Sequence, residues 1–259
     1  MAPGGTLPSG ADRTPRGCNG LMTTPQDALL GPDDAYVLDH AAWTSLTGPH
    51  ARFAEVKGQA ARYPADVSPF VAIAPDADQE VFADLLALVG PGGLVPLAGL
   101  AASLPPGWEL ADRGDGVQMI DVGLRAAESS EAVCLHEGDV AEMLDLAGRT
   151  RPGPFLPRTI EMGTYLGVRR GGLLVAMAGQ RLHPPGWVEI SAVCTDPAYR
   201  GQGLATLLVR AVAADIREQG SVPFLHAAAS NENAIRLYQS LGFTIRRRTR
   251  FQLVRIPAR

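Results

Sequence analysis

The stretch "TDPAYRGQGLATLLVRAV", Thr195 to Val212, places Arg200 and two glycines directly before a regular apolar pattern typical of a helix. The first amides of a helix have no intrahelical acceptor, and the positive end of the helix dipole lies behind them. Because Gly201 and Gly203 lack side chains, a phosphate-sized anion can approach these amides, and Arg200 adds a positive charge. The pattern predicts an anion site; a tight strand-to-helix turn that uses glycine is the alternative.

Two common nucleotide-binding loops do not fit this spacing. A Walker loop requires a lysine, and Lys57 is the only lysine of the chain. A dinucleotide-binding loop requires a third glycine where Thr206 stands, and the strands expected before the loop form a meander rather than opening a βαβ unit.

A second pattern, "NENAIRLYQSLGF" from Asn231 to Phe243, predicts a short helix that begins at an Asn cap and ends at Gly242. With it, "RGQGLA" resembles the acetyl-CoA pyrophosphate loop of the GNAT superfamily of N-acetyltransferases. In that loop Gln or Arg is followed by two residues, Gly, one residue and then Gly or Ala. The resemblance covers roughly residues 132–256 and is closest to the branch with glycine-N-acyltransferase-like C-terminal domains.

The resemblance implies roles for individual residues. The cofactor would be acetyl-CoA, with Asn231 helping to hold its arm and Tyr238 protonating the thiolate that leaves. An ordinary core aromatic is the alternative for Tyr238. The backbone at the end of the preceding strand would face the pantetheine, and the loop would hold the pyrophosphate; these residues are Val193, Cys194, Thr195, Arg200, Gly201, Gln202, Gly203, Leu204 and Ala205.

The general base is predicted on the strand before the loop. Strand alternation predicts that Glu189 shares a face with Ser191, Val193 and Thr195, so we expect its carboxylate to deprotonate the amine directly or through water. An exposed strand glutamate is the alternative. Cys194 is expected on the opposite face, which argues against a covalent acyl-cysteine. His226 on the next strand is expected to be a packing residue.

The elements that position these residues follow from periodicity. After residue 130 the patterns predict a strand, a helix, a loop, three antiparallel strands, a helix, a strand, a helix and a closing strand. The predicted fold class is α/β (α+β), with a mixed, mostly antiparallel GNAT-type sheet flanked by helices.

Three segments are predicted along the chain: a flexible tail at residues 1–22, a smaller α/β domain at 23–122, and the GNAT domain at 123–259. The small domain is expected to contain a strand at Phe70–Ala74, a helix opening at Asp78 and a hairpin turn at Asp115–Gly116. A degenerate copy of the GNAT fold is one interpretation of it. Residues from about 126 onward are expected to make all the cofactor contacts.

Composition narrows the class of protein. The chain has 259 residues and a net charge of −4, which argues against a nucleic-acid partner. Its three cysteines form no CxxC pair and its five histidines are scattered, so no disulfide framework or metal site is expected, and a reducing cytoplasm fits. No apolar run is long enough for a membrane span, and no secretion signal is recognisable.

Together these patterns predict an acetyl-CoA-dependent N-acyltransferase that moves an acetyl group to a primary amine by direct attack on the thioester. A non-catalytic CoA-binding or sensor module is the alternative. The acceptor, a small-molecule or peptide amine, is not readable from the sequence, and the oligomeric state, monomer or homodimer, is left open.

Overall fold

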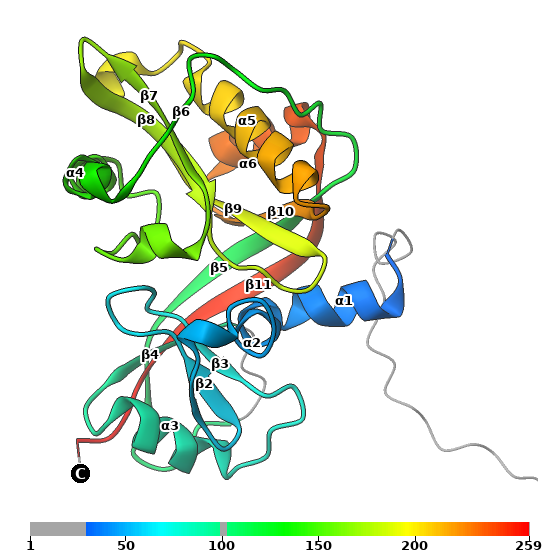
Figure 1. Ribbon diagram of the computed structural model, residues 1–259. Coiled ribbons are helices and arrows are strands. Elements are labelled where there is room, and N and C mark those ends of the chain that lie inside the picture. Colours follow the sequence, from blue (N-terminus) through cyan, green and yellow to red (C-terminus); the bar gives the residue numbers. More distant parts are fainter. Residues whose placement is uncertain (1–29, 99–102, 259) are drawn as a thin grey trace, which may run out of the picture.

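The computed structural model describes residues 30–98 and 103–258 (Figure 1). The predicted tail, residues 1–22, lies outside them. The helices and strands are α1 (Pro32–Asp39), α2 (Ala41–Leu46), β1 (Glu55–Lys57), β2 (Ala60–Arg62), β3 (Val71–Ile73), α3 (Val81–Val89), β4 (Leu94–Ala98), β5 (Glu109–Asp121), β6 (Val133–Cys134), α4 (Val140–Thr150), β7 (Tyr165–Arg170), β8 (Leu173–Gln180), β9 (Trp187–Thr195), α5 (Leu204–Glu218), β10 (Val222–Ala228), α6 (Glu232–Leu241) and β11 (Phe243–Arg255).

One eight-stranded sheet carries most of these elements, in the order β4-β11-β5-β10-β9-β8-β7-β6. Neighbouring strands run antiparallel except β9 and β10, which are parallel. The predicted order of elements after residue 130 is confirmed, as is the mixed, mostly antiparallel sheet flanked by helices. Gly171 and Gly172, both with positive φ, close the predicted hairpin between β7 and β8.

Helices cover both faces of this sheet. Figure 1 shows α5 and α6 on one side and α4 on the other. Helix α5 buries an apolar stripe with four-residue spacing, Leu204, Leu208, Val212 and Ile216, against the first face. Helix α4 packs Met143 and Leu146 against the second. Helices therefore cover both faces of the central strands.

The 13-residue strands β5 and β11 pair with each other and carry the sheet into the N-terminal half. Strand β5 also pairs with β10, and the far end of β11 pairs with β4. Because β5 lies between β10 and β11, the boundary predicted at residue 123 cuts through the sheet. A segment that begins at about residue 126 therefore lacks β5, the strand between β10 and β11, and that this segment makes all the cofactor contacts stays a prediction.

The hairpin turn predicted at Asp115 and Gly116 is wrong, because β5 continues through both residues. A Cβ at Gly116 would stand 2.4 Å from Cε2 of Phe251 on β11. Glycine is thus required there for the close approach of an aromatic ring and not for a turn.

The N-terminal half contains a smaller sheet of three strands in the order β1-β2-β3. Strand β3 confirms the strand predicted at Phe70–Ala74, and α3 confirms the predicted helix, which begins at Val81. Two helices, three antiparallel strands, a helix and a strand follow one another here, from α1 to β4. The C-terminal half repeats this order from α4 to β10, with a 3-10 turn at Thr159–Met162 in the place of the second helix.

Candidate active site

The glycine loop lies between the end of β9 at Thr195 and the start of α5 at Leu204. Gly201 and Gly203 have φ angles of +78° and +77°, which L side chains rarely adopt. No heavy atom of the described residues lies within 4 Å of the point where a Cβ would stand on either glycine, apart from their chain neighbours. The mouth of α5 is therefore open to a ligand.

Hydrogen-bonding groups at this mouth fit an anionic cofactor. The first bond of α5 runs from Leu207 N to Gly203 O (3.0 Å), so the amides of residues 204–206 precede any intrahelical acceptor. Arg200 is exposed and donates from Nε to Thr195 O (3.4 Å). The Oγ1 atom of Thr195 is buried without a hydrogen-bond partner among the described residues. These donors fit the pyrophosphate and pantetheine that the sequence predicted.

Strands β9 and β10 separate in front of this loop. They pair from Trp187 to Ile190 and from Val222 to Leu225. Further along, β9 stays bound to β8 and β10 stays bound to β5, while no pairing between β9 and β10 is present in the described part of the chain. The two parallel strands thus splay, which leaves backbone groups on both sides of a gap that leads to the mouth of α5.

A bulge in β9 corrects the predicted alternation of faces. Cys194 pairs with Met177 and Ser191 with Gly179, so two residues of β9 oppose Ala178, and Ala192 has a φ of +53°. Consequently Val193 packs in the α5 cluster together with Val188 and Ile190, and Ala192 and Cys194 pack in the α4 cluster. Val193 does not share a face with Glu189, because the extra residue reverses the alternation.

Glu189 is fully buried and bound from two sides. Its carboxylate accepts two hydrogen bonds from Arg181, at 2.9 and 2.6 Å, and one from Nδ1 of His226 at 2.7 Å. Burial opposes ionisation, but the charge of Arg181 and these hydrogen bonds outweigh it, so the pKa of Glu189 lies far below its usual range. Both oxygens are engaged, and proton abstraction by Glu189 would require one of these bonds to break.

The orientation of His226 is fixed by Gln118 of β5, which Arg246 of β11 holds in turn. Arg246 donates to Oε1 of Gln118 (2.6 Å), which sets the direction of the Gln118 amide. The amide nitrogen of Gln118 then donates to Leu38 O (2.8 Å) and to Nε2 of His226 (3.2 Å). The imidazole therefore accepts at Nε2 and donates from Nδ1 to Glu189. Arg246 also binds Asp39 (2.6 Å), which ties this chain of hydrogen bonds to α1.

Tyr238 lies on α6, 8% exposed, and packs against Phe243 with ring centroids 6.1 Å apart. Burial, then the nearby Cys194, raises the pKa of Tyr238 to about 12, so its hydroxyl is protonated at neutral pH. Asn231 is exposed and accepts a hydrogen bond from Ala234 N (3.2 Å), which caps α6 as predicted. Burial raises the pKa of the Cys194 thiol.

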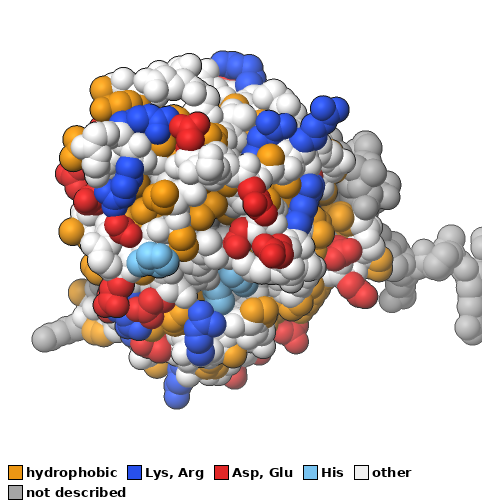
Figure 2. All heavy atoms as spheres, turned by 45° about the horizontal axis from the view of Figure 1, so that its top comes forward, with side chains coloured by type: hydrophobic (Ala, Val, Ile, Leu, Met, Phe, Trp, Pro, Cys, Tyr) orange, Lys and Arg blue, Asp and Glu red, His pale blue; other side chains and the backbone are white. Residues whose placement is uncertain are grey.

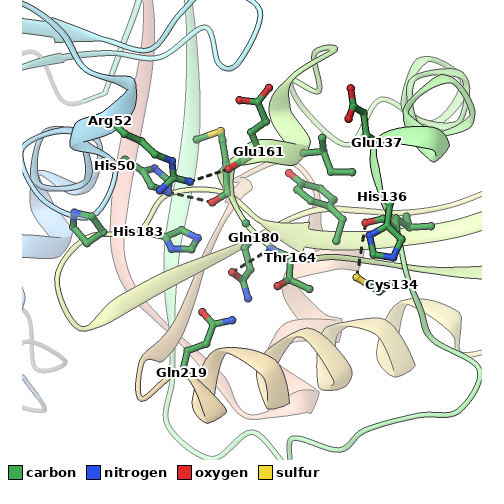
Figure 3. A pocket seen from close by; sticks show the side chains of 16 residues that line it. His50, Arg52, Cys134, His136, Glu137, Glu161, Thr164, Gln180, His183 and Gln219 are labelled. Carbon is green, nitrogen blue, oxygen red and sulfur yellow. Dashed lines mark hydrogen bonds between the residues drawn. The ribbon is translucent and has the colours of Figure 1, made fainter.

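A cavity of about 620 Å³ lies beside these strands (Figure 3). Its lining joins residues of the N-terminal half to the segment before β7, to β6 and to the end of α5: among them are His50, Arg52, Glu137, Glu161, Tyr165, Gln180, His183 and Gln219. Sequence reasoning missed this cavity and the partners Arg181 and Gln118. The contacts of Gln118 join segments far apart in the chain, and that of Arg181 depends on the pairing of neighbouring strands, so local sequence patterns do not indicate either.

The curated relatives match less than half of this chain. The FR47-like protein family matches residues 165–252. The N-alpha-acetyltransferase RimI of Mycobacterium tuberculosis is 40% identical over 82 residues, which is 30% of this chain and 51% of that protein. The mycothiol acetyltransferase of Thermomonospora curvata is 36% identical over 83 residues, 32% of this chain and 28% of that protein. The chain thus spans about half the length, or less, of these curated relatives.

A solved structure covers much more. A structure described as a GNAT-family acetyltransferase, from Novosphingobium aromaticivorans, is 40% identical and has a TM-score of 0.77, covering 84% of this chain and 97% of its own. The chain belongs to the GNAT family. A GCN5-related N-acetyltransferase from Kribbella flavida, 20% identical with a TM-score of 0.55, has the same fold.

Two further observations concern the surface and possible cofactors of this GNAT protein. Figure 2 shows Lys and Arg interspersed with Asp and Glu on the visible face, rather than gathered in one basic patch. Within residues 30–98 and 103–258 no helix has the length and apolar character of a membrane span, and no cluster of His, Cys, Asp and Glu has the arrangement of a metal site.

Proposed function

We propose that this GNAT protein is an acetyl-CoA-dependent N-acyltransferase that moves an acetyl group to a primary amine by direct attack on the thioester. The open, glycine-lined mouth of α5 at the end of two splayed strands is the observation that carries this proposal. The amides of residues 201–205 would hold the pyrophosphate, and the backbone of Val193–Thr195 the pantetheine. When bound, acetyl-CoA would supply the activated acyl group.

Tyr238 is the proposed acid. Its raised pKa keeps the proton on the hydroxyl, and its neighbour Cys194 places it beside the end of β9, where the thiolate would leave. For the base we propose Glu189, which would act directly or through water once one of its hydrogen bonds opens, with His226 as its hydrogen-bond partner at the start of the splay. Arg181 would hold the Glu189 carboxylate in place.

For the N-terminal half we propose a degenerate copy of the GNAT fold that does not bind the cofactor. Its element order repeats that of the C-terminal half. The segment before α3 carries Asp76, Asp78 and Glu80 where the C-terminal copy carries glycines, and Oδ1 of Asp78 accepts from Glu80 N (2.9 Å). An anion would be repelled there.

Release of free CoA thiol tests the function. Acetyl-CoA is incubated with the protein and a panel of amino acids, polyamines, aminoglycosides and short peptides. Amine-dependent release with formation of the acetylated amine supports the proposal, whereas tight binding of acetyl-CoA with no transfer to any amine supports the non-catalytic CoA-binding module instead. A cytoplasmic location and the oligomeric state stay predictions.

A further inference from the structure

The cavity described above lies where the two halves of the chain meet, and its volume of about 620 Å³ is that of a small-molecule site. His50 and Arg52 come from the N-terminal half and Gln180 from β8 (Figure 3). Tyr165 of β7 also lines the cavity. Gln180 pairs with Ile190, the last residue of β9 that is bound to β10. The cavity therefore reaches the strand beside the splay.

Two polar groups in the lining have unused hydrogen-bonding capacity. Tyr165 is 1% exposed, and its hydroxyl has no hydrogen-bond partner among the described residues. The same holds for Nε2 of His183, whose ring stacks on that of His50 with centroids 4.6 Å apart. Buried polar groups are almost always paired, so these two atoms are suited to bind a polar ligand or a water that bridges to it.

The charges on the lining are few and separate. The carboxylate of Glu161 is bound by Arg158 at 2.6 and 2.8 Å, which neutralises it. Glu137 and Arg52 have no ion pair within the described ranges, and Figure 3 shows them at opposite ends of the lining. The guanidinium of Arg52 lies over the Phe53 ring, 4.4 Å from its centroid. One end of the cavity is thus cationic and the other anionic.

We propose that this cavity binds the acceptor of the transfer reaction, and that the acceptor carries an amino group and, a few bonds away, a carboxylate or peptide carbonyl, as amino acids and peptide N-termini do. This inference rests on the proposed function. A ligand with both groups complements Glu137 and Arg52 together. A polyamine has no group for Arg52 and would be repelled by it. The N-terminal half, on this account, builds one wall of the acceptor site.

Replacement of Tyr165 by Phe separates a binding role from a structural one. Because the hydroxyl has no partner to lose within residues 30–98 and 103–258, Tyr165→Phe should leave the Tm unchanged or slightly higher. If the hydroxyl binds the acceptor, the acceptor KM should rise by about 3- to 10-fold, the effect of one neutral hydrogen bond, while the KM for acetyl-CoA stays the same. Tyr36→Phe, at a tyrosine 52% exposed on α1, is the control and should change neither the Tm nor the KM of either substrate.

The probes are alanine, alaninamide, trialanine and spermidine, together with the amino acids and tripeptides that differ from alanine in the first side chain. Arg52→Gln should raise the KM of the free amino acids more than that of their amides, which lack the carboxylate. Unchanged acceptor KM in both variants, or faster transfer to spermidine than to every α-amino probe, overturns the inference while acyl transfer itself stands. Absence of transfer to every amine overturns the proposed function and the inference with it.

Discussion

Acid pH should destabilise this protein through two stacked histidines of the cavity. Burial, followed by the charges of His183 and Arg52, lowers the pKa of His50 from 6.5 to about 3. Burial and the charge of Arg52 lower the pKa of His183 to about 4. The unfolded chain therefore binds protons below pH 6.5 that the folded chain does not bind. Stability is fully present above pH 6.5 and is lost as the pH falls below it.

The size of the effect follows from the pKa values. From pH 6.5 to pH 5, about 1.5 pH units, each histidine is protonated in the unfolded chain but not in the folded chain. Each such unit lowers the free energy of unfolding by about 1.4 kcal/mol per histidine. Each one should thus remove about 2 kcal/mol of the free energy of unfolding. For a chain of this size that lowers the Tm by roughly 4 to 8 °C per histidine.

Thermal or urea unfolding at pH 7.5, 6.5, 5.5 and 5.0 measures this loss. His50→Gln should be less stable than the wild type at pH 7.5, because hydrogen bonds to Tyr63 (3.0 Å) and Met162 O (3.1 Å) are lost, yet its pH dependence should be smaller by about 2 kcal/mol. Equal pH dependence in the wild type and His50→Gln would refute the reasoning.

Three other predictions concern the proposed acid, the buried ion pair and the sheet. Tyr238→Phe should keep acetyl-CoA affinity within a few-fold while kcat falls by roughly 10²-fold, and full turnover with chemistry limiting the rate would remove Tyr238 as the acid. Glu189→Gln should lower the free energy of unfolding by about 3 to 5 kcal/mol in denaturant titrations, because Arg181 loses its counter-charge in the interior; a loss below about 1 kcal/mol would mean that water reaches the pair. A fragment of residues 126–259 should fail to fold by circular dichroism, since it lacks β5, and a folded fragment that binds acetyl-CoA would contradict this.

Local patterns were enough to predict the loop and the helices. The turn at Gly201 and Gly203 and the cap at Asn231 depend on residues a few positions away, so the sequence was enough to predict this local structure. The bulge at Ala192 was not, because alanine carries no signal of a positive φ and the bulge is imposed by pairing with β8.

Long-range pairing accounts for the other differences. Gly116 was interpreted as a turn residue, but a glycine is needed there because the ring of Phe251 packs against it. Phe251 lies 135 positions away in the chain and reaches Gly116 only because β11 pairs with β5. Glu189 was expected to be available as a base, but its partners Arg181 and His226 reach it across neighbouring strands. Such contacts depend on strand order and register, which periodicity alone does not define.

Binding of acetyl-CoA to two matched glycine variants tests the central claim most directly. Gly203 at the start of α5 and Gly220 just beyond its end both have a φ of +77°, and no heavy atom of the described residues, apart from chain neighbours, lies within 4 Å of a Cβ at either position. Gly203→Val and Gly220→Val should therefore be strained alike. Only Gly203→Val should weaken acetyl-CoA binding in calorimetry, by about 10- to 100-fold, because a branched side chain would displace the pyrophosphate from the amides. Equal affinity in the two folded variants would contradict a cofactor site at the mouth of α5.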